Sequence, residues 1–350
     1  MHTPPSPIPV ALLGATGSVG QRFVQLLEGH PWFRLTRVAA SPRSVGRRYA
    51  DAVRWTRPEP IPAGIADLVL QPADELGPER LVFSGLDASV AGELESLHAG
   101  CGALVVTNAR NHRMDAGVPL VVPELNGEQL ELLERDRGGI ISNPNCSTIG
   151  LALALAPLQR AFGVRRVMVT TLQALSGAGL DGLTGQVVED NLIPLIVGEE
   201  AKLESEARKI LGVLEGGAVR EAALAISATC VRVPISDGHT LSVSVELERP
   251  VELAELRASW EGFAVPDDVR ALPSAPERPV VLLDEPDAPQ PRLHRELGNG
   301  MTASIGRVRE CPLFDWKFVT LSHNTLRGAA GGALLAGELA VVRGYLPERA

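Results

Sequence analysis

A cysteine that directly follows a tight turn has the setting of a nucleophile. Residues 140–142 are a short apolar run, an Asn-Pro-Asn tripeptide then predicts a turn, and Cys146 precedes an apolar helical pattern at residues 148–162. At the first turn of a helix, the dipole and unpaired N–H groups lower a thiol pKa and supply donors for an oxyanion. We therefore predict that Cys146 attacks an acyl phosphate and carries the acyl group as a thioester that can accept a hydride. The alternative is a buried packing cysteine.

The other cysteines lack this setting, and we expect them to be structural or incidental thiols. None of the four forms a C-x-x-C pair, so the sequence predicts neither a zinc site nor a disulfide framework, and we expect no metal. The three remaining positions are Cys101, Cys230 and Cys311.

A thiol nucleophile needs a base nearby, and histidine is the usual one. Of the seven histidines, His239 has the best context, because a glycine turn presents it between two predicted strands. Arg232 lies seven residues upstream, and its guanidinium can grip a carboxylate through two hydrogen bonds. We predict His239 as the base; the alternative is a turn histidine bonded to backbone.

A glycine loop near the N-terminus has the pattern of a dinucleotide site. Glycines recur three apart in the sequence from Gly14 to Gly20, after an apolar strand and before an amphipathic helix. This spacing lets the backbone approach a pyrophosphate, whose charge the helix N-terminus favours. The alternative is a turn used only for packing. The residues expected to bind the cofactor are Gly14, Thr16, Gly17, Ser18 and Val19.

The end of the second predicted strand, residues 35–40, indicates which dinucleotide binds. NAD enzymes usually carry an acidic residue there, whereas this sequence has Ser41-Pro-Arg43-Ser44. Because a guanidinium and two hydroxyl groups can hold a 2′-phosphate, we predict NADP, bound by Ser41, Arg43 and Ser44. Taken alone, Arg43 is also compatible with a solvated loop.

Length and charge limit the class of protein. A chain of 350 residues suits two domains, and a net charge of −9 argues against nucleic acid or an anionic membrane as partner. No run of about 18 apolar residues predicts a membrane span, and the N-terminus does not resemble a signal peptide. We expect a cytoplasmic protein.

The order of the predicted elements gives the fold. Short apolar runs alternate with helical patterns up to Cys146, which predicts an α/β fold with a mostly parallel, doubly wound sheet of the Rossmann type. Longer β-rich runs follow and predict an α+β domain with a mixed or antiparallel sheet, while residues 266–277 suit a surface connection. We expect a nucleotide domain at residues 1–147, completed by a C-terminal helix within residues 325–350, and a catalytic and dimerisation domain at residues 148–324.

The two main motifs together resemble those of one enzyme family. Asn-Pro-Asn-Cys146-Ser-Thr, preceded by Gly14-Ala-Thr-Gly-Ser-Val-Gly, is similar to aspartate-semialdehyde dehydrogenase, particularly its archaeal and fungal-type branch. The resemblance extends over most of the chain. It implies NADPH-dependent reductive dephosphorylation of L-aspartyl 4-phosphate to L-aspartate 4-semialdehyde, in the biosynthesis of lysine, threonine, methionine and isoleucine. It also implies a homodimer or homotetramer.

The same resemblance implies further site residues. The family's phosphate arginine precedes a methionine, which favours Arg113 over Arg110. A Glu and a Lys three apart match Glu199 for the substrate ammonium and Lys202 for phosphate, although this pattern alone is typical of a solvated helix face. Further matches are Gln173 near the substrate carbonyl, Ser176 and Gly177 near the nicotinamide, and Asn324 at the cofactor or as a helix N-cap.

Two other functions fit part of the sequence. A malonyl-CoA reductase of the same fold would use the same cysteine and hydride step on a thioester substrate. A non-catalytic NADP-binding regulator would not require Cys146, His239 and Arg232 together.

Overall fold

The first part of the chain forms a six-stranded parallel sheet in the computed structural model, which describes residues 4, 6–179 and 190–347. Its strands lie in the order β3-β2-β1-β4-β5-β6, and all five neighbouring pairs are parallel. This order is that of a Rossmann fold. In such a fold a ligand binds where the strand order reverses, which here is between β1 and β4. The bounds are β1 (Ile8–Leu13), β2 (Phe33–Ala40), β3 (Gln71–Pro72), β4 (Leu81–Ser84), β5 (Leu104–Thr107) and β6 (Gly139–Ser142).

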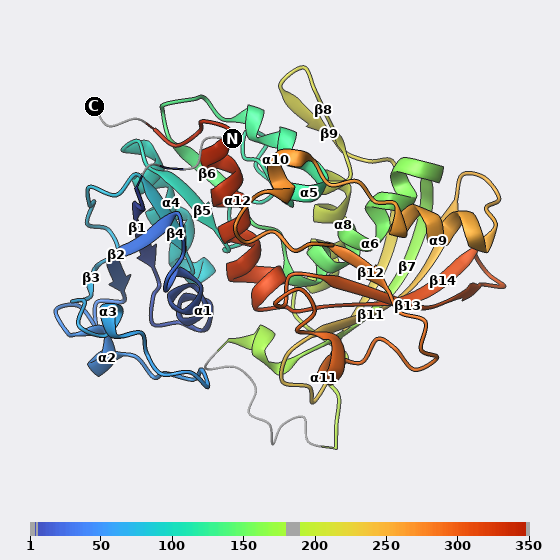
Figure 1. The fold of residues 1–350 in the computed structure, drawn as a ribbon, viewed down its shortest axis with the longest axis horizontal. Coiled ribbons are helices and arrows are strands. Elements are labelled where there is room, and N and C mark those ends of the chain that lie inside the picture. Colours follow the sequence, from blue (N-terminus) through green and yellow to red (C-terminus); the bar gives the residue numbers. More distant parts are fainter. Residues whose placement is uncertain (1–3, 5, 180–189, 348–350) are drawn as a thin grey trace.

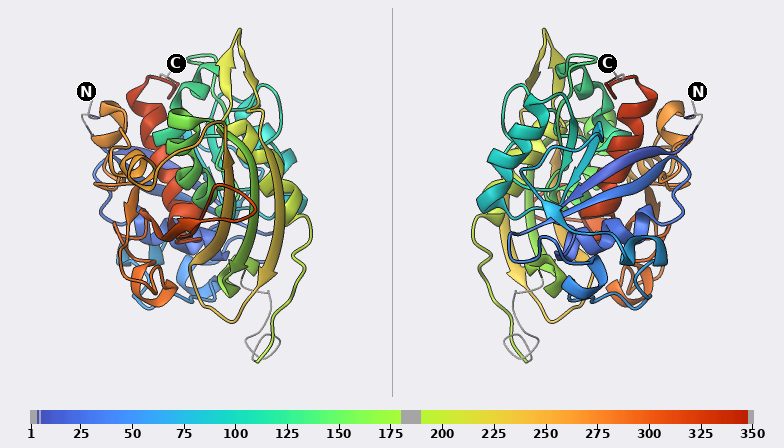
Figure 2. Two further views of the ribbon diagram at one scale, coloured as in Figure 1. Left: turned by 90° about the vertical axis from the view of Figure 1, so that its right-hand side faces the viewer. Right: turned by 90° about the vertical axis from the view of Figure 1, so that its left-hand side faces the viewer.

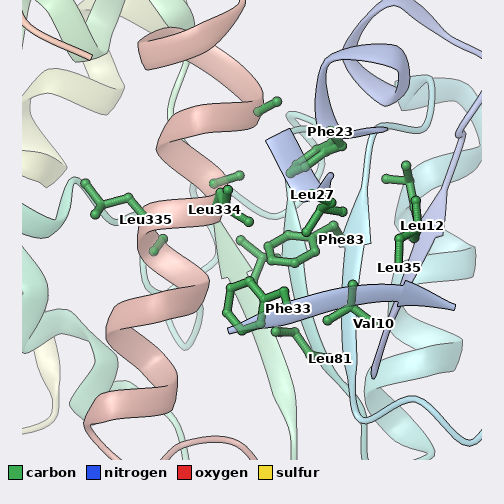
Figure 3. Packing of buried hydrophobic residues seen from close by; sticks show 14 of the residues in the cluster. Val10, Leu12, Phe23, Leu27, Phe33, Leu35, Leu81, Phe83, Leu334 and Leu335 are labelled. Atoms are coloured by element: carbon green, nitrogen blue, oxygen red, sulfur yellow. The ribbon is translucent and has the colours of Figure 1, made fainter. Parts of the chain in front are cut away.

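Helices from both ends of the chain pack on this sheet. The helix α12 (Gly331–Val342) is buried over most of its length, and Leu334 lies in one cluster with Phe23, Leu27 and Phe83 (Figure 3). The chain thus returns to the first sheet at its end. The other helical segments here are α1 (Ser18–Leu27), α2 (Tyr49–Ala52), α3 (Ala63–Ala66), α4 (Ala88–Gly100), α5 (Pro123–Asn126) and the 3₁₀ segment η1 (Gly127–Leu132).

A second six-stranded sheet, mixed in direction, forms the other half of the molecule (Figure 1). Its order is β10-β7-β11-β14-β13-β12, with parallel pairs at both edges and antiparallel pairs between. The predicted α/β fold with a second mixed-sheet domain is therefore confirmed. The strands are β7 (Val164–Gln173), β10 (Ala225–Arg232), β11 (His239–Leu247), β12 (Val280–Leu282), β13 (Ala303–Glu310) and β14 (Trp316–Ser322).

One face of the second sheet packs against helices, and the strands are seen in front of the molecule in the left view of Figure 2. Along β7, residues alternate between buried and exposed, with Met168 and Leu172 on the exposed side. This alternation is that of a sheet with one open face. The helical segments of this half are α6 (Cys146–Phe162), η2 (Leu175–Ala178), α8 (Glu199–Ile210), α9 (Leu253–Glu261) and α11 (Pro291–His294), whereas α10 (Asp267–Arg270) packs against α12 of the first half.

Three local features differ from the sequence-based expectation. The segment 266–277 is more than a surface connection, because Val269 and Leu272 are buried and Glu338 accepts hydrogen bonds from the backbone and hydroxyl of Ser274. A hairpin of β8 (Val213–Glu215) and β9 (Ala218–Arg220) was not predicted. The last helical region begins as a π-helical segment, η3 (Leu326–Ala330). No helix in the described part of the chain is long and apolar enough to cross a membrane.

Candidate active site

A pocket of 390 Å³ gathers most of the predicted catalytic residues. Helix α6 supplies Cys146, the end of β7 supplies Gln173, and the start of α8 supplies Glu199 and Lys202. The parallel pairing of β7 and β10 sets Gln173 beside Arg232, and antiparallel β11 begins where β7 ends. The pocket is lined by Asn145, Cys146, Gln173, Gly177, Ala178, Leu195, Ile196, Val197, Glu199, Lys202, Arg232 and His239.

Cys146 is the first residue of α6. The side chain of Asn145 caps this helix, since its Oδ1 accepts hydrogen bonds from Ser147 N at 3.0 Å and Thr148 N at 3.3 Å. A Cβ added to Gly328 would lie 2.5 Å from the Cβ of Cys146, so the chain must carry glycine there. Together these contacts fix the backbone and the Cβ of Cys146.

The predicted depression of the thiol pKa is wrong for the ligand-free chain. Burial, reinforced by the charge of Glu199, raises the pKa of Cys146 to about 12. The charges of Arg113 and Arg232 act in the opposite direction, as does a backbone hydrogen bond, but they do not outweigh desolvation. The surroundings of Cys146 in the protein therefore favour the neutral thiol.

Glu199 is the centre of a hydrogen-bond network in the pocket floor. Its Oε2 accepts from Asn145 Nδ2 at 2.9 Å and from Gln173 Nε2 at 3.2 Å, while Oε1 pairs with Lys202 Nζ at 2.5 Å. Burial raises the pKa of Glu199, but Lys202 and the two amide donors outweigh it and leave the pKa below its ordinary value. Glu199 is thus an ionised, buried carboxylate, so the reading of this segment as a solvated helix face is wrong.

His239 is fully buried and neutral. The backbone N–H of Ala174 donates to its Nδ1 at 3.1 Å, and burial together with the charge of Arg232 lowers its pKa to about 3. Because Nδ1 accepts, Nε2 carries the hydrogen, and this atom has no hydrogen-bond partner among the described residues. The ring therefore offers a donor, which differs from the base expected from the sequence.

Arg232 lies beside His239 under a loop glycine. The Nη1 of Arg232 donates to Ala174 O at 2.5 Å, and Arg232 is 5% exposed. A Cβ on Gly177 would lie 2.8 Å from Arg232 Nη1 and 3.2 Å from His239 Nε2. Glycine at position 177 thus leaves both groups access to the pocket.

Arg113 is buried close to this pocket but is absent from its lining. Its Nη1 pairs with Glu206 at 3.0 Å, its Nη2 donates to Asn108 O at 2.7 Å, and its charge lowers the pKa of Cys146. Arg110 is exposed. The structure therefore brings Arg113, rather than Arg110, toward the nucleophile.

A second pocket, of 770 Å³, lies at the carboxyl ends of β1, β2 and β4, where a Rossmann sheet binds its ligand. Gly14 has φ +72°, and a Cβ there would lie 2.7 Å from Gly85 O. A Cβ on Gly20 would lie 2.2 Å from Gly14 O, so the loop keeps close backbone contacts that only glycine permits. The predicted residues Gly14, Thr16, Gly17 and Ser41 line this pocket. These features fit a dinucleotide.

Four other residues predicted to bind the cofactor are absent from the lining of this pocket. Ser18 and Val19 open α1, with Ser18 Oγ accepting from Arg57. Arg43 is exposed, and Ser44 N donates to Ser41 O at 2.9 Å in the same turn.

Asn324 ties together two loops beside the catalytic pocket. Its Oδ1 accepts from Gly238 N at 2.9 Å, and its Nδ2 donates to Ser176 Oγ at 2.8 Å. It does not cap the last helix, where Thr325 precedes the first turn. The predicted nicotinamide-loop residue Ser176 is thereby linked to Asn324.

Several lining residues were not singled out from the sequence. Leu86, Val90 and Leu94 form an apolar wall of the larger pocket at a helical spacing of four, and Asp74 and Asp87 lie at its edge. Their position after β4 could have revealed them, because ligands bind at the carboxyl ends of such strands. The segment 195–197 of the catalytic pocket had no comparable signal in the sequence, and neither did Glu206, which bonds the backbone N of Asn145 without lining the pocket.

Comparisons with known proteins agree with this geometry. Residues 9–133 match the model described as semialdehyde dehydrogenase, NAD binding domain, and residues 155–327 match the model described as semialdehyde dehydrogenase, dimerisation domain. The chain is 44% identical to aspartate-semialdehyde dehydrogenase of Archaeoglobus fulgidus over 95% of this chain and 97% of that protein. The corresponding Cryptococcus neoformans protein is 43% identical over 98% and 100% of the two chains.

Solved structures show the same similarity. Aspartate semialdehyde dehydrogenase with NADP from Candida albicans superimposes with a TM-score of 0.89 at 40% identity, covering 96% of this chain and 99% of that one. Aspartate semialdehyde dehydrogenase II from Vibrio cholerae, complexed with ASA, superimposes with a TM-score of 0.77 at 27% identity, covering 96% and 98%.

Proposed function

The chain belongs to the family of aspartate-semialdehyde dehydrogenases, and from that premise we propose how its two pockets reduce L-aspartyl 4-phosphate to L-aspartate 4-semialdehyde with NADPH. The observation that carries the proposal is the convergence of Cys146, His239 and Arg232 on one pocket, in a chain whose first sheet also forms a dinucleotide cradle. The product feeds the biosynthesis of lysine, threonine, methionine and isoleucine, as in the family.

The first half of the reaction forms a thioester on Cys146. The sulfur attacks the acyl carbon, a C–S bond forms, and the bond from that carbon to the phosphate oxygen breaks. An acyl phosphate dianion and a thiol give a thioester and hydrogen phosphate, so the thiol proton leaves with the phosphate. This balance suits a cysteine whose pKa of about 12 keeps it protonated in the free chain.

The second half reduces the thioester. Gly14, Gly17, Ser41, Arg43 and Ser44 would hold NADPH, which would supply a hydride to the thioester carbon. The charge that develops on the acyl oxygen meets the Nε2–H of His239, which has no other partner among the described residues. A fixed, desolvated donor of this kind stabilises an oxyanion strongly. The C–S bond then breaks, the aldehyde leaves, and one proton from solvent restores the thiol.

Each charged residue of the pocket is assigned to a different group of the substrate. Arg232 is placed to grip the carboxylate that remains in the product, since its guanidinium borders the pocket beside His239. Lys202 and Arg113 are assigned to the phosphate, and ionised Glu199 to the ammonium group. Gln173 borders the same floor and is assigned to the substrate carbonyl.

One assay tests this proposal and its nearest rival. NADP reduction by the purified protein should require both aspartate semialdehyde and phosphate, and Cys146→Ala should lower turnover by several orders of magnitude while NADPH still binds. NADPH oxidation with malonyl-CoA in place of aspartyl phosphate would instead indicate a malonyl-CoA reductase. A Cys146→Ala rate within about tenfold of the unmodified protein would exclude the thioester route.

We also propose that the chain forms a homodimer through the open face of its second sheet, in the part that matches a dimerisation domain. The exposed Met168 and Leu172 on β7 support this surface. Light scattering with Met168→Glu, which should yield a monomer, tests it.

Four free cysteines support a reducing compartment such as the cytoplasm.

A further inference from the structure

Helix α8 presents four charged side chains, in alternating sign, toward the catalytic pocket and the loop behind it. Glu199 and Lys202 border the pocket, whereas Glu206 and Lys209 lie one and two turns further along and are both buried. The spacing of three or four residues keeps all four on one face of the helix. The mechanism above uses only the first two.

Glu206 connects the phosphate arginine to the nucleophile. Its Oε1 accepts from Arg113 Nη1 at 3.0 Å, and its Oε2 accepts from the backbone N of Asn145 at 2.6 Å. The residue is 2% exposed, so both bonds are made in a buried, charge-assisted setting. One carboxylate therefore holds both Arg113 and the residue before Cys146.

The loop that carries Arg113 is fixed by the same helix. Lys209 Nζ donates to the carbonyls of Arg113 and Asp115 at 2.8 Å and of Val118 at 2.9 Å. Arg113 also keeps Nε without a partner in the described part of the chain. The guanidinium is thus held at Nη1 and Nη2 by Glu206 and by the carbonyl of Asn108.

We propose that Glu206 is a positioning residue that sets the distance between the phosphate-binding Arg113 and the sulfur of Cys146. The inference rests on the proposed function, in which the sulfur of Cys146 attacks the acyl carbon that carries the phosphate leaving group. Its carboxylate has the two acceptors required to bridge two donors, and neither a shorter acid nor an amide can do the same. A displacement of about 1 Å between reacting groups can lower a rate by about 10²-fold.

Two substitutions separate position from charge. Glu206→Gln keeps the shape but turns an NH₂ group toward one of the two donors. Glu206→Asp keeps the charge but is one methylene too short to reach both. If position matters, both variants should lose about 10²-fold in kcat/KM for phosphate in the reverse assay, while KM for the semialdehyde changes by less than about twofold. Glu204→Gln is the matched control, because Glu204 lies on α8, is partly buried and accepts a hydrogen bond from the backbone N of Ala228 in β10, 3.0 Å away, and not from Arg113 or Asn145.

A double-mutant cycle with Arg113→Ala shows whether Glu206 acts through the arginine. Once Arg113 is removed, Glu206→Gln should have little further effect on kcat/KM for phosphate, because the bridge no longer exists. NADPH affinity and thermal unfolding, measured on every variant, report whether the fold is intact. A Glu206→Asp variant as active as the unmodified protein, a lower KM for phosphate in Glu206→Gln, or additive losses in the cycle would each overturn the inference. An unmodified protein without phosphate-dependent activity would instead refute the proposed function.

Discussion

Replacing His239 by two different amides tests whether its ring works as a donor or as a base. The amide nitrogen of Gln can occupy the place of Nε2, whereas the shorter Asn side chain reaches only the place of Nδ1. His239→Gln can therefore keep a donor toward the acyl oxygen, and His239→Asn can keep the acceptor for Ala174 N, which is 3.1 Å from Nδ1. Neither amide can take up a proton at neutral pH, so both are equally deficient as bases.

The magnitude follows from the environment of the ring. His239 is 0% exposed, and its Nε2 lacks any partner in the described structure, so a substrate oxygen meets a desolvated and oriented donor. Removing one such donor from an oxyanion site costs about 10²–10³-fold in kcat, or about 3–4 kcal/mol. We expect His239→Asn and His239→Ala to lose this full amount, and His239→Gln to retain at least about tenfold more activity than His239→Asn.

The assay is the steady-state rate of NADP reduction between pH 5 and pH 9. With a pKa of about 3, His239 stays neutral throughout, so it should contribute no ionisation near its ordinary value to the kcat profile. The reasoning is refuted if His239→Gln is as inactive as His239→Asn. It is equally refuted if the unmodified protein loses activity below pH 6.5 with a transition that the Gln variant lacks.

Three further predictions follow from the charges of the two sites. Arg43→Ala should weaken NADPH binding by about 1–3 kcal/mol and leave NADH almost unchanged, and equal weakening in a fluorescence titration would contradict the assignment of its guanidinium to the 2′-phosphate. In the reverse assay, Lys202→Ala should raise KM for phosphate, whereas Arg232→Lys should raise KM for the semialdehyde, because an ammonium cannot make the planar two-bond grip; the opposite pattern would reverse the assignment. Burial lowers the pKa of His239 to about 3 and of His323 to about 4, so below pH 6.5 the unfolded chain binds protons that the folded chain does not. The free energy of unfolding should therefore fall as pH falls from 6.5 to 5, by up to about 1.4 kcal/mol per pH unit for each histidine. Thermal unfolding should show a shallower pH dependence in His323→Gln, and an unchanged slope would contradict the role of this buried ring.

Local patterns in the sequence were sufficient to predict the strands and turns that directly precede the site residues. The glycine loop after β1 and the Asn-Pro-Asn turn after β6 both fall at carboxyl ends of parallel strands, where a doubly wound sheet exposes its ligand-binding residues. Cys146 therefore could be placed at the first turn of a helix from sequence alone. The two strand patterns that flank the glycine turn before His239 likewise correspond to β10 and β11, although β11 pairs with β7 and β14 and not with β10.

The charge on these residues was harder to predict, because it depends on partners from distant segments. The turn before α6 correctly indicated backbone donors around Cys146, yet the sequence does not show that burial, together with the charge of Glu199, will raise its pKa. It also does not show that Ala174 N will occupy Nδ1 of His239. The first contact forms when α8 packs against α6, and the second forms where β7 pairs with β11.

Helix α8 shows the physical reason for this limit most clearly. Leu203, Ala207 and Ile210 form its apolar side, and the other side is rich in charged residues. This pattern is typical of a helix that covers a core on one side and faces water on the other. Nothing local distinguishes that arrangement from one in which the charged side is buried against another domain. What distinguishes them is whether each charge finds a partner, since burying an unpaired charge is costly. Here Glu206 meets Arg113 and an amide, and Lys209 meets three carbonyls, so all the partners lie in segments that only the tertiary fold brings to the helix.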